Sequence, residues 1–150
     1  MNKTIATDID TIAEKCIAVR MRLLNRVITN LYDDALRPLG LKVSQLNILI
    51  VTNRLGLARP TQVCDILQLD ASTLSRNIKP LQAHGWLEVL HEADARAQPF
   101  RLMPQGKKLI AQAVPAWEKA QLQATELLGI EMITLLDKAV HKVNKDQAPT

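Results

Sequence analysis

The first apolar pattern spans residues 9–35, where apolar side chains recur at steps of three and four and mark one face of a long helix. Pro38 and Gly40 follow this pattern and end the helix, because neither residue continues a helix readily. A second helix is expected from Ser44 to Gly56. Its run of four consecutive apolar residues indicates burial on more than one side.

Two shorter helices are expected between residues 61 and 84, separated by a tight turn. Asp70 can cap the second of them by accepting a backbone N–H bond, and Gly85 suits the left-handed position just beyond its end. Apolar residues at steps of four and three form the buried stripe of this helix; they are Leu74, Ile78 and Leu81. Small, polar and cationic residues occupy the remaining face; they are Ser72, Thr73, Ser75, Arg76 and Lys79.

The exposed face of this helix suits the major groove of DNA. It carries no carboxylate between Ala71 and Lys79, so it can approach phosphates without like-charge repulsion. Its hydroxyls and its guanidinium can meet base edges. An ordinary solvated helix face can have the same composition, so this stretch alone leaves both interpretations open.

A two-stranded ribbon follows the exposed helix. Residues 86–90 and 98–102 are rich in strand formers and can pair, which leaves a loop between them that holds Asp94 and Arg96. A further helix is then expected from Pro104 to about Gly129, because proline suits the first helical turn even though Met103 is a weak cap. A last apolar pattern at residues 130–143 marks a final helix.

The order of these features carries a resemblance to a known family. The two short helices are followed by Gly-Trp-Leu at Gly85, by Asp-x-Arg at Asp94 and by Leu-x-x-x-Gly from Leu102 to Gly106. Over nearly its whole length, the chain resembles the MarR family of bacterial transcription regulators, whose members carry a winged helix-turn-helix.

The resemblance implies a mainly α fold of the α+β type, formed by residues 1–150 as a single domain. The winged helix-turn-helix lobe would comprise residues 41–103, and the long helices at residues 1–40 and 104–145 would serve dimerisation. These long helices carry apolar stripes that a wing of this size cannot cover, so a second copy of the chain is the expected partner. A monomeric helical bundle that closes on itself is the alternative.

The resemblance also implies a function and a site. Two copies would bind a pseudo-palindromic operator in double-stranded DNA, most simply as a repressor, with residues 71–84 in the major groove and the wing at the minor groove. Arg96 would enter the minor groove, steadied by Asp94, and Lys79 would contact phosphate. The expected DNA-contacting residues are Ser72, Thr73, Ser75, Arg76, Lys79, Asp94 and Arg96.

A small-molecule effector is a further expectation of the resemblance, in a pocket where the dimerising helices meet the DNA-binding lobe. The candidate wall residues, which also fit a core or an interface, are Cys16, Arg20, Tyr32, Asn47 and Trp117. Cys16 suggests a redox-sensing regulator as an alternative, but it lies about two residues earlier than the cysteine of peroxide-sensing members. Val43 and Leu46 also replace the tyrosine partners that those members carry beside the second helix.

Composition narrows the possible classes of protein but does not identify one. The net charge of +4 and pI of about 9.3 permit nucleic-acid binding but do not require it. Two cysteines, and no signal peptide or long apolar run, favour a reduced cytoplasmic setting with no membrane partner. No Cys or His pair has ligand spacing and no phosphate-binding or nucleophile motif occurs, so no metal, cofactor or enzyme activity is expected. A winged-helix protein-interaction module without DNA contact remains the alternative from another class.

Overall fold

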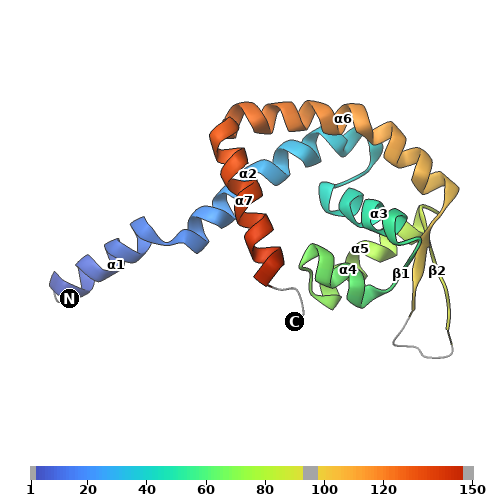
Figure 1. The fold of residues 1–150 in the computed structure, drawn as a ribbon, viewed down its shortest axis with the longest axis horizontal. Helices are drawn as coiled ribbons and strands as arrows, with labels where there is room; N and C mark the ends of the chain where they lie inside the picture. The colour runs from blue at the N-terminus through green and yellow to red at the C-terminus, as the bar shows by residue number, and fades with distance from the viewer. Residues whose placement is uncertain (1–2, 93–97, 147–150) are drawn as a thin grey trace.

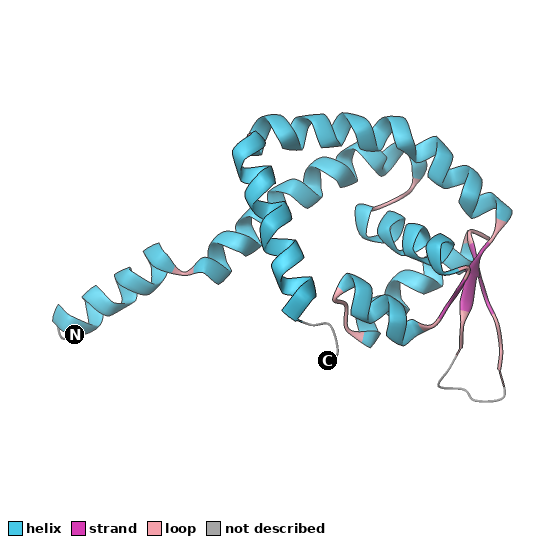
Figure 2. Ribbon diagram, viewed as in Figure 1, coloured by secondary structure: helices cyan, strands magenta, loops and turns pink. Residues whose placement is uncertain are grey.

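The computed structural model describes residues 3–92 and 98–146, and most of them are helical (Figure 1). A small antiparallel sheet lies at one end of the molecule (Figure 2). The elements in chain order are α1 (Lys3–Lys15), α2 (Ile17–Leu36), η1 (Arg37–Leu39), α3 (Val43–Leu55), β1 (Leu57–Ala58), α4 (Pro60–Leu67), α5 (Ala71–Ala83), β2 (Leu87–Val89), β3 (Phe100–Leu102), α6 (Pro104–Leu128) and α7 (Ile130–Asp146). The expected mainly α architecture with a small wing is confirmed.

The N-terminal region consists of two helices, so the prediction of one continuous helix over residues 9–35 is wrong. Cys16 takes an extended backbone conformation, with φ −65° and ψ 110°, and separates α1 from α2. The apolar periodicity continues on both sides of Cys16, which is why a break of one residue is invisible in the pattern. Figure 1 shows α1 extending away from the rest of the chain.

The start of α3 is fixed by polar contacts on both sides of its first turn. The Val43 N–H donates to Asp33 Oδ1 of α2 at 2.8 Å, and the Lys42 N–H donates to Gln45 Oε1 at 3.0 Å. These contacts satisfy two of the N–H groups that a helix start leaves without an intrahelical acceptor. Gly56, at φ +72°, follows the last residue of α3, where the sequence predicts the end of this helix.

The three strands form an antiparallel sheet in the order β1-β3-β2. Phe100 of β3 lies opposite Ala58 of β1 on one side and Val89 of β2 on the other. The expected ribbon is therefore present, with strands shorter than the apolar runs that predicted them. Two short helices followed by such a sheet form a winged helix-turn-helix.

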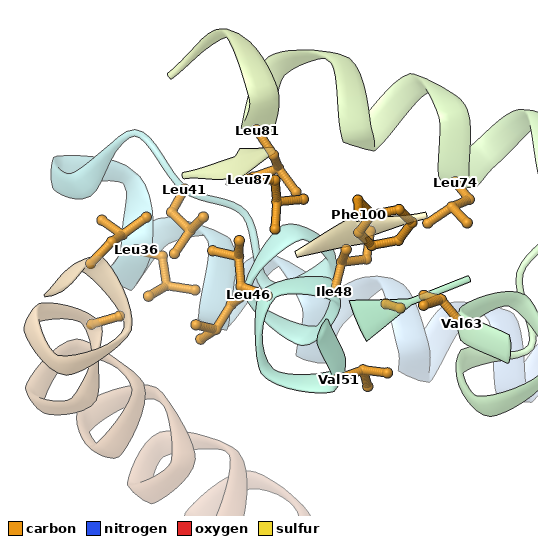
Figure 3. Close-up of a cluster of buried hydrophobic side chains, with 14 residues drawn as sticks. Leu36, Leu41, Leu46, Ile48, Val51, Val63, Leu74, Leu81, Leu87 and Phe100 are labelled. Carbon is orange, nitrogen blue, oxygen red and sulfur yellow. The ribbon is translucent and has the colours of Figure 1, made fainter. Parts of the chain in front are cut away.

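The core of the molecule lies between this sheet, α3 and the helix-turn-helix (Figure 3). Phe100 is 1% exposed, and Figure 3 shows its ring among side chains from α3 and α5. Leu36 from the end of α2 and Leu109 from α6 extend the same cluster, so the long helices are anchored to the lobe. Ile66 of α4, in contrast, is 55% exposed.

The long helices leave many apolar side chains in solvent. α6 packs along α2, and α7 turns back from α6 at Gly129, which has a φ of +77° (Figure 1). The exposed large apolar residues on these helices and on α1 are Ile5, Ile9, Ile12, Ile17, Val19, Met21, Leu23, Val27, Val114, Trp117, Leu122, Leu127, Ile130, Met132, Leu135, Val140 and Val143. Over residues 3–92 and 98–146, none of the helices combines the length and apolar character needed to cross a bilayer.

Candidate nucleic-acid interface

The second helix of the helix-turn-helix, α5, begins at a well-formed cap. The carboxylate of Asp70 accepts the Thr73 backbone N–H at 2.7 Å and the Ser72 hydroxyl at 2.8 Å. These bonds keep the carboxylate charged: the Thr73 N–H, the hydroxyls of Ser72 and Thr73 and the nearby Arg76 lower the pKa of Asp70 to about 2. The predicted cap is confirmed, and it ties the charge of Asp70 to the helix start.

Burial orients α5 relative to the rest of the lobe. Leu74 is 2% exposed and Leu81 is 0% exposed, and Ile78 packs against the same core. The predicted stripe therefore faces inward, and the polar face is free. Gly85 has a φ of +73°, the left-handed conformation that the end of this helix requires.

The predicted contact residues on α5 lie together on one side of the helix. Ser72, Ser75, Arg76 and Lys79 are exposed, whereas Thr73 is half-buried. The Arg76 Nη2 group donates to Thr73 Oγ1 at 3.2 Å, a contact that spacing alone did not predict. No Asp or Glu side chain lies on α5 from Ala71 to Ala83, so the face is cationic.

The wing lies beside this face. Arg101 of β3 pairs with Glu88 of β2 at 2.7 Å, and Arg59 before α4 pairs with Glu92 at 3.5 Å. Sequence reasoning missed Arg59, because its place beside the wing follows from the pairing of β1 with β3 rather than from any local pattern. Two predicted wing residues, Asp94 and Arg96, lie outside the described residues.

A small cleft separates α5 from the wing. It has a volume of about 250 Å³. Ser75 and Lys79 contribute from α5, and His91 and Gln98 contribute from the ribbon, above an apolar floor that includes Phe100. The cleft brings two of the predicted DNA-contacting residues next to the wing.

In the single chain, the five predicted effector residues do not line the same described pocket. Trp117 lines an apolar pocket of about 240 Å³ between α3 and α6. The other pocket residues, which the sequence offered only as core positions, are Leu46, Ile50, Ile110, Ala113 and Val114.

The remaining four residues lie elsewhere. Cys16 is half-buried at the α1–α2 break, and Arg20 is exposed, with its guanidinium donating to the carbonyl of Glu14. The Tyr32 hydroxyl donates to Gln121 Oε1, and Asn47 is exposed on α3. Cys16 and Cys64 are both free thiols.

The described residues hold no cluster of three or more His, Cys, Asp or Glu side chains that could bind a metal ion.

Cys64, on α4, packs against the core. Burial, together with the charges of Asp65 and Asp70, raises the pKa of its thiol. A raised pKa leaves a thiol protonated and unreactive at neutral pH.

Comparison with known proteins identifies the lobe. Residues 39–97, which include α3, the helix-turn-helix and the first strand of the ribbon, match the model of the MarR family. This part of the chain is therefore similar to the MarR family. The HTH-type transcriptional regulator YwoH of Bacillus subtilis (strain 168) is 28% identical over 83 residues, which are 55% of this chain and 61% of that protein. This chain therefore covers less than two thirds of that relative.

Solved structures extend the MarR-type likeness beyond the lobe. A mutant MarR from E. coli complexed with operator DNA has a TM-score of 0.75 at 20% identity, over 89% of this chain and 96% of that one. A probable transcriptional regulator from Pseudomonas aeruginosa gives 0.74 at 19% identity, over 87% and 98%. BpsR of Bordetella bronchiseptica, whose DNA binding is regulated by 6-hydroxynicotinic acid, has a TM-score of 0.73 at 19% identity. The match covers 87% of this chain and 95% of that one. At these identities the likeness establishes the fold of MarR-family transcriptional regulators.

Proposed function

We propose that this chain is a homodimeric transcriptional regulator that binds a pseudo-palindromic operator through α5 and the wing. The observation that carries the proposal is the outward face of α5. Ser72, Ser75, Arg76 and Lys79 are exposed there, without a carboxylate on the helix, while the opposite stripe is anchored in the core. A rigid helix with a cationic, hydroxyl-rich face fits the major groove, where base edges present acceptors and donors.

Dimerisation is supported by the apolar surface of the long helices. Seventeen large apolar residues on α1, α2, α6 and α7 are exposed in the single chain, which is far more than scattered surface residues would explain. Packing these helices against a second copy through a two-fold axis covers that surface. The same axis presents two α5 helices about 34 Å apart, one turn of DNA.

Within each half-site, we assign Arg76 to base reading and Lys79 to phosphate. A guanidinium can donate two parallel bonds to guanine O6 and N7, an interaction worth about 1 to 3 kcal/mol of discrimination. Lys79 lies nearly one turn further along α5 and lines the cleft beside the wing, so it faces the backbone of the duplex in this arrangement. Arg96 remains our candidate for the minor groove.

The test uses duplexes selected from fragments of the source genome by the wild-type protein. Arg76→Ala should flatten the preference at one position of each half-site. Lys79→Ala should weaken all sequences alike and lower the salt slope by about one unit for each phosphate that the lysine no longer neutralises. A uniform decrease in affinity for Arg76→Ala would make it a phosphate-binding residue, and absence of salt-dependent binding by the wild type would favour a protein-interaction module instead.

We also propose that the regulator is a repressor released by a small ligand, which enters the pocket beside Trp117. This pocket lies between α3 of the lobe and α6 of the long-helix layer, so a ligand there can change how the two parts pack. All six side chains that line it are apolar or aromatic. A compact, uncharged aromatic molecule fits this lining, whereas a buried carboxylate would lack a partner.

Ligand binding can be followed through Trp117. The chain has two tryptophans, and Trp86→Phe leaves Trp117 as the only indole reporter. Phenol should quench or shift its fluorescence and weaken operator binding, and benzoate, of similar size but charged, should do neither. Equal responses to both compounds would contradict the assignment of ligand class.

A further inference from the structure

A chain of polar groups joins the cap of α5 to its exposed guanidinium. Asp70 accepts the Thr73 backbone N–H at 2.7 Å, and Thr73 Oγ1 accepts from Arg76 Nη2 at 3.2 Å. The Thr73 backbone carbonyl in turn accepts from the Asn77 side-chain amide at 2.9 Å. Thr73 is half-buried, whereas Arg76 is exposed. The less mobile Thr73 side chain therefore orients the more mobile Arg76 side chain.

The hydroxyl of Thr73 suits this position because it can both accept and donate a hydrogen bond. It accepts one hydrogen bond from the guanidinium and can still donate its own hydrogen toward the carboxylate of Asp70. A hydroxyl polarised by a carboxylate is a better acceptor for a cation. The arrangement thus links a fixed negative charge to Arg76 without placing a carboxylate on the face that would meet DNA.

The hydrogen bond to Thr73 leaves Arg76 able to read a base. A guanidinium has five N–H donors arranged along two edges, each of which can donate two parallel bonds. Thr73 takes one hydrogen of Nη2, so the edge that uses the other Nη2 hydrogen keeps both of its donors. Among the described residues, the ion pairs of arginine with a carboxylate involve Arg37, Arg59 and Arg101, and Arg76 is not held in that way.

We propose that Thr73 is a specificity-determining positioning residue, whose hydroxyl fixes the Arg76 guanidinium before DNA binds. This inference rests on the proposed function of α5. A free arginine loses much rotamer entropy when it is ordered in a complex, and a side chain that is already ordered loses less. The gain is realised only where Arg76 donates both bonds to a base, so Thr73 affects sequence preference more than general affinity.

Two substitutions separate the hydroxyl from the shape of the side chain. Thr73→Val keeps the β-branched shape and a similar helix propensity, and it leaves the backbone N–H that caps onto Asp70. Thr73→Ser keeps the hydroxyl and removes the methyl group. The measured quantity is the ratio of dissociation constants for two duplexes: the operator selected by the wild type, and the same duplex changed at the base pair that Arg76→Ala affects.

Thr73→Val should reduce this ratio by about three- to tenfold, the size expected for one hydrogen bond, while Thr73→Ser stays near the wild type. Adding Thr73→Val to Arg76→Ala should cause no further decrease in preference, because the two residues act as one unit. Circular dichroism and thermal melting would verify that both variants keep the fold.

Two results would overturn the inference. The first is an unchanged ratio for Thr73→Val, whether or not its affinity falls uniformly for all sequences, and the second is an equal decrease in the ratio for Thr73→Ser. Failure of the proposed function would look different. In that case the wild-type protein would select no operator, and Arg76→Ala would have no position to affect.

Discussion

Gly106 provides a sharp test of how α6 is joined to the wing. It lies in the first turn of α6, where replacing glycine with alanine ordinarily stabilises a helix by up to about 1 kcal/mol. Here a Cβ atom would lie 2.3 Å from the Trp86 carbonyl oxygen and 2.6 Å from Leu102 Cδ1. The leucine methyl can rotate away. The carbonyl cannot, because it belongs to the backbone and accepts the Met103 N–H at 3.0 Å.

Gly106→Ala therefore forces the first turn of α6 away from the wing. Overpacking of this kind costs about 1 to 3 kcal/mol, which exceeds the gain in helix propensity. A net destabilisation of about 1 to 2 kcal/mol corresponds to a decrease in melting temperature of roughly 2 to 8 °C for a chain of this size.

The assay is thermal unfolding followed by circular dichroism, at one fixed protomer concentration because the proposed association would contribute to stability. Gln105→Ala is the matched control, since Gln105 is exposed in the same helical turn and its replacement should change stability by less than about 0.5 kcal/mol. A Gly106→Ala protein that melts at or above the wild-type temperature would refute the steric argument.

Three further predictions concern the cap, the dimer and the pocket. The folded-state pKa of Asp70 is lowered to about 2, so its contribution to stability is complete above the ordinary value of 3.8 and is lost as the pH falls toward about 2. Asp70→Asn should abolish that acid-dependent part, and melting curves that remain parallel for both proteins from pH 6 to pH 2 would contradict it. Leu135→Asp places a charge on the apolar face of α7, where Leu135 is 59% exposed in the single chain. Light scattering should then report a monomer at micromolar concentration, and a persistent dimer would exclude this face from the interface. In the Trp86→Phe protein, Val114→Phe should fill the pocket and abolish the phenol response of Trp117 without weakening operator binding, whereas an unchanged response would place the ligand elsewhere.

Local chemistry explains why the sequence predicted α5 well. The Asp70 cap, the stripe at Leu74 and Leu81 and the left-handed Gly85 each depend on neighbours within a few residues. The exposed face follows from that stripe, because a helix with one anchored side must present the other. These features need no knowledge of the tertiary structure.

Long-range packing decides what the sequence could not predict. Trp117 reaches the pocket only because α6 lies against α3, and Tyr32 contacts Gln121 because α6 runs along α2. Periodicity places such residues on a face but does not say which helix covers it. The extended backbone at Cys16 was missed for a related reason, because the apolar steps continue across it.

The extended backbone at Cys16 separates α1 from α2, and this break has a consequence for how the protein behaves on dilution. α1 has 13 residues, a length at which an isolated helix in water is only marginally formed, since nucleation is costly and few bonds repay it. Its isoleucines are exposed in the single chain, and in the proposed dimer they would pack against the second copy, which would couple the helix–coil equilibrium of α1 to association by mass action. Far-ultraviolet circular dichroism per residue should accordingly rise with protomer concentration, and the helix content of this chain becomes a measure of its own dimerisation.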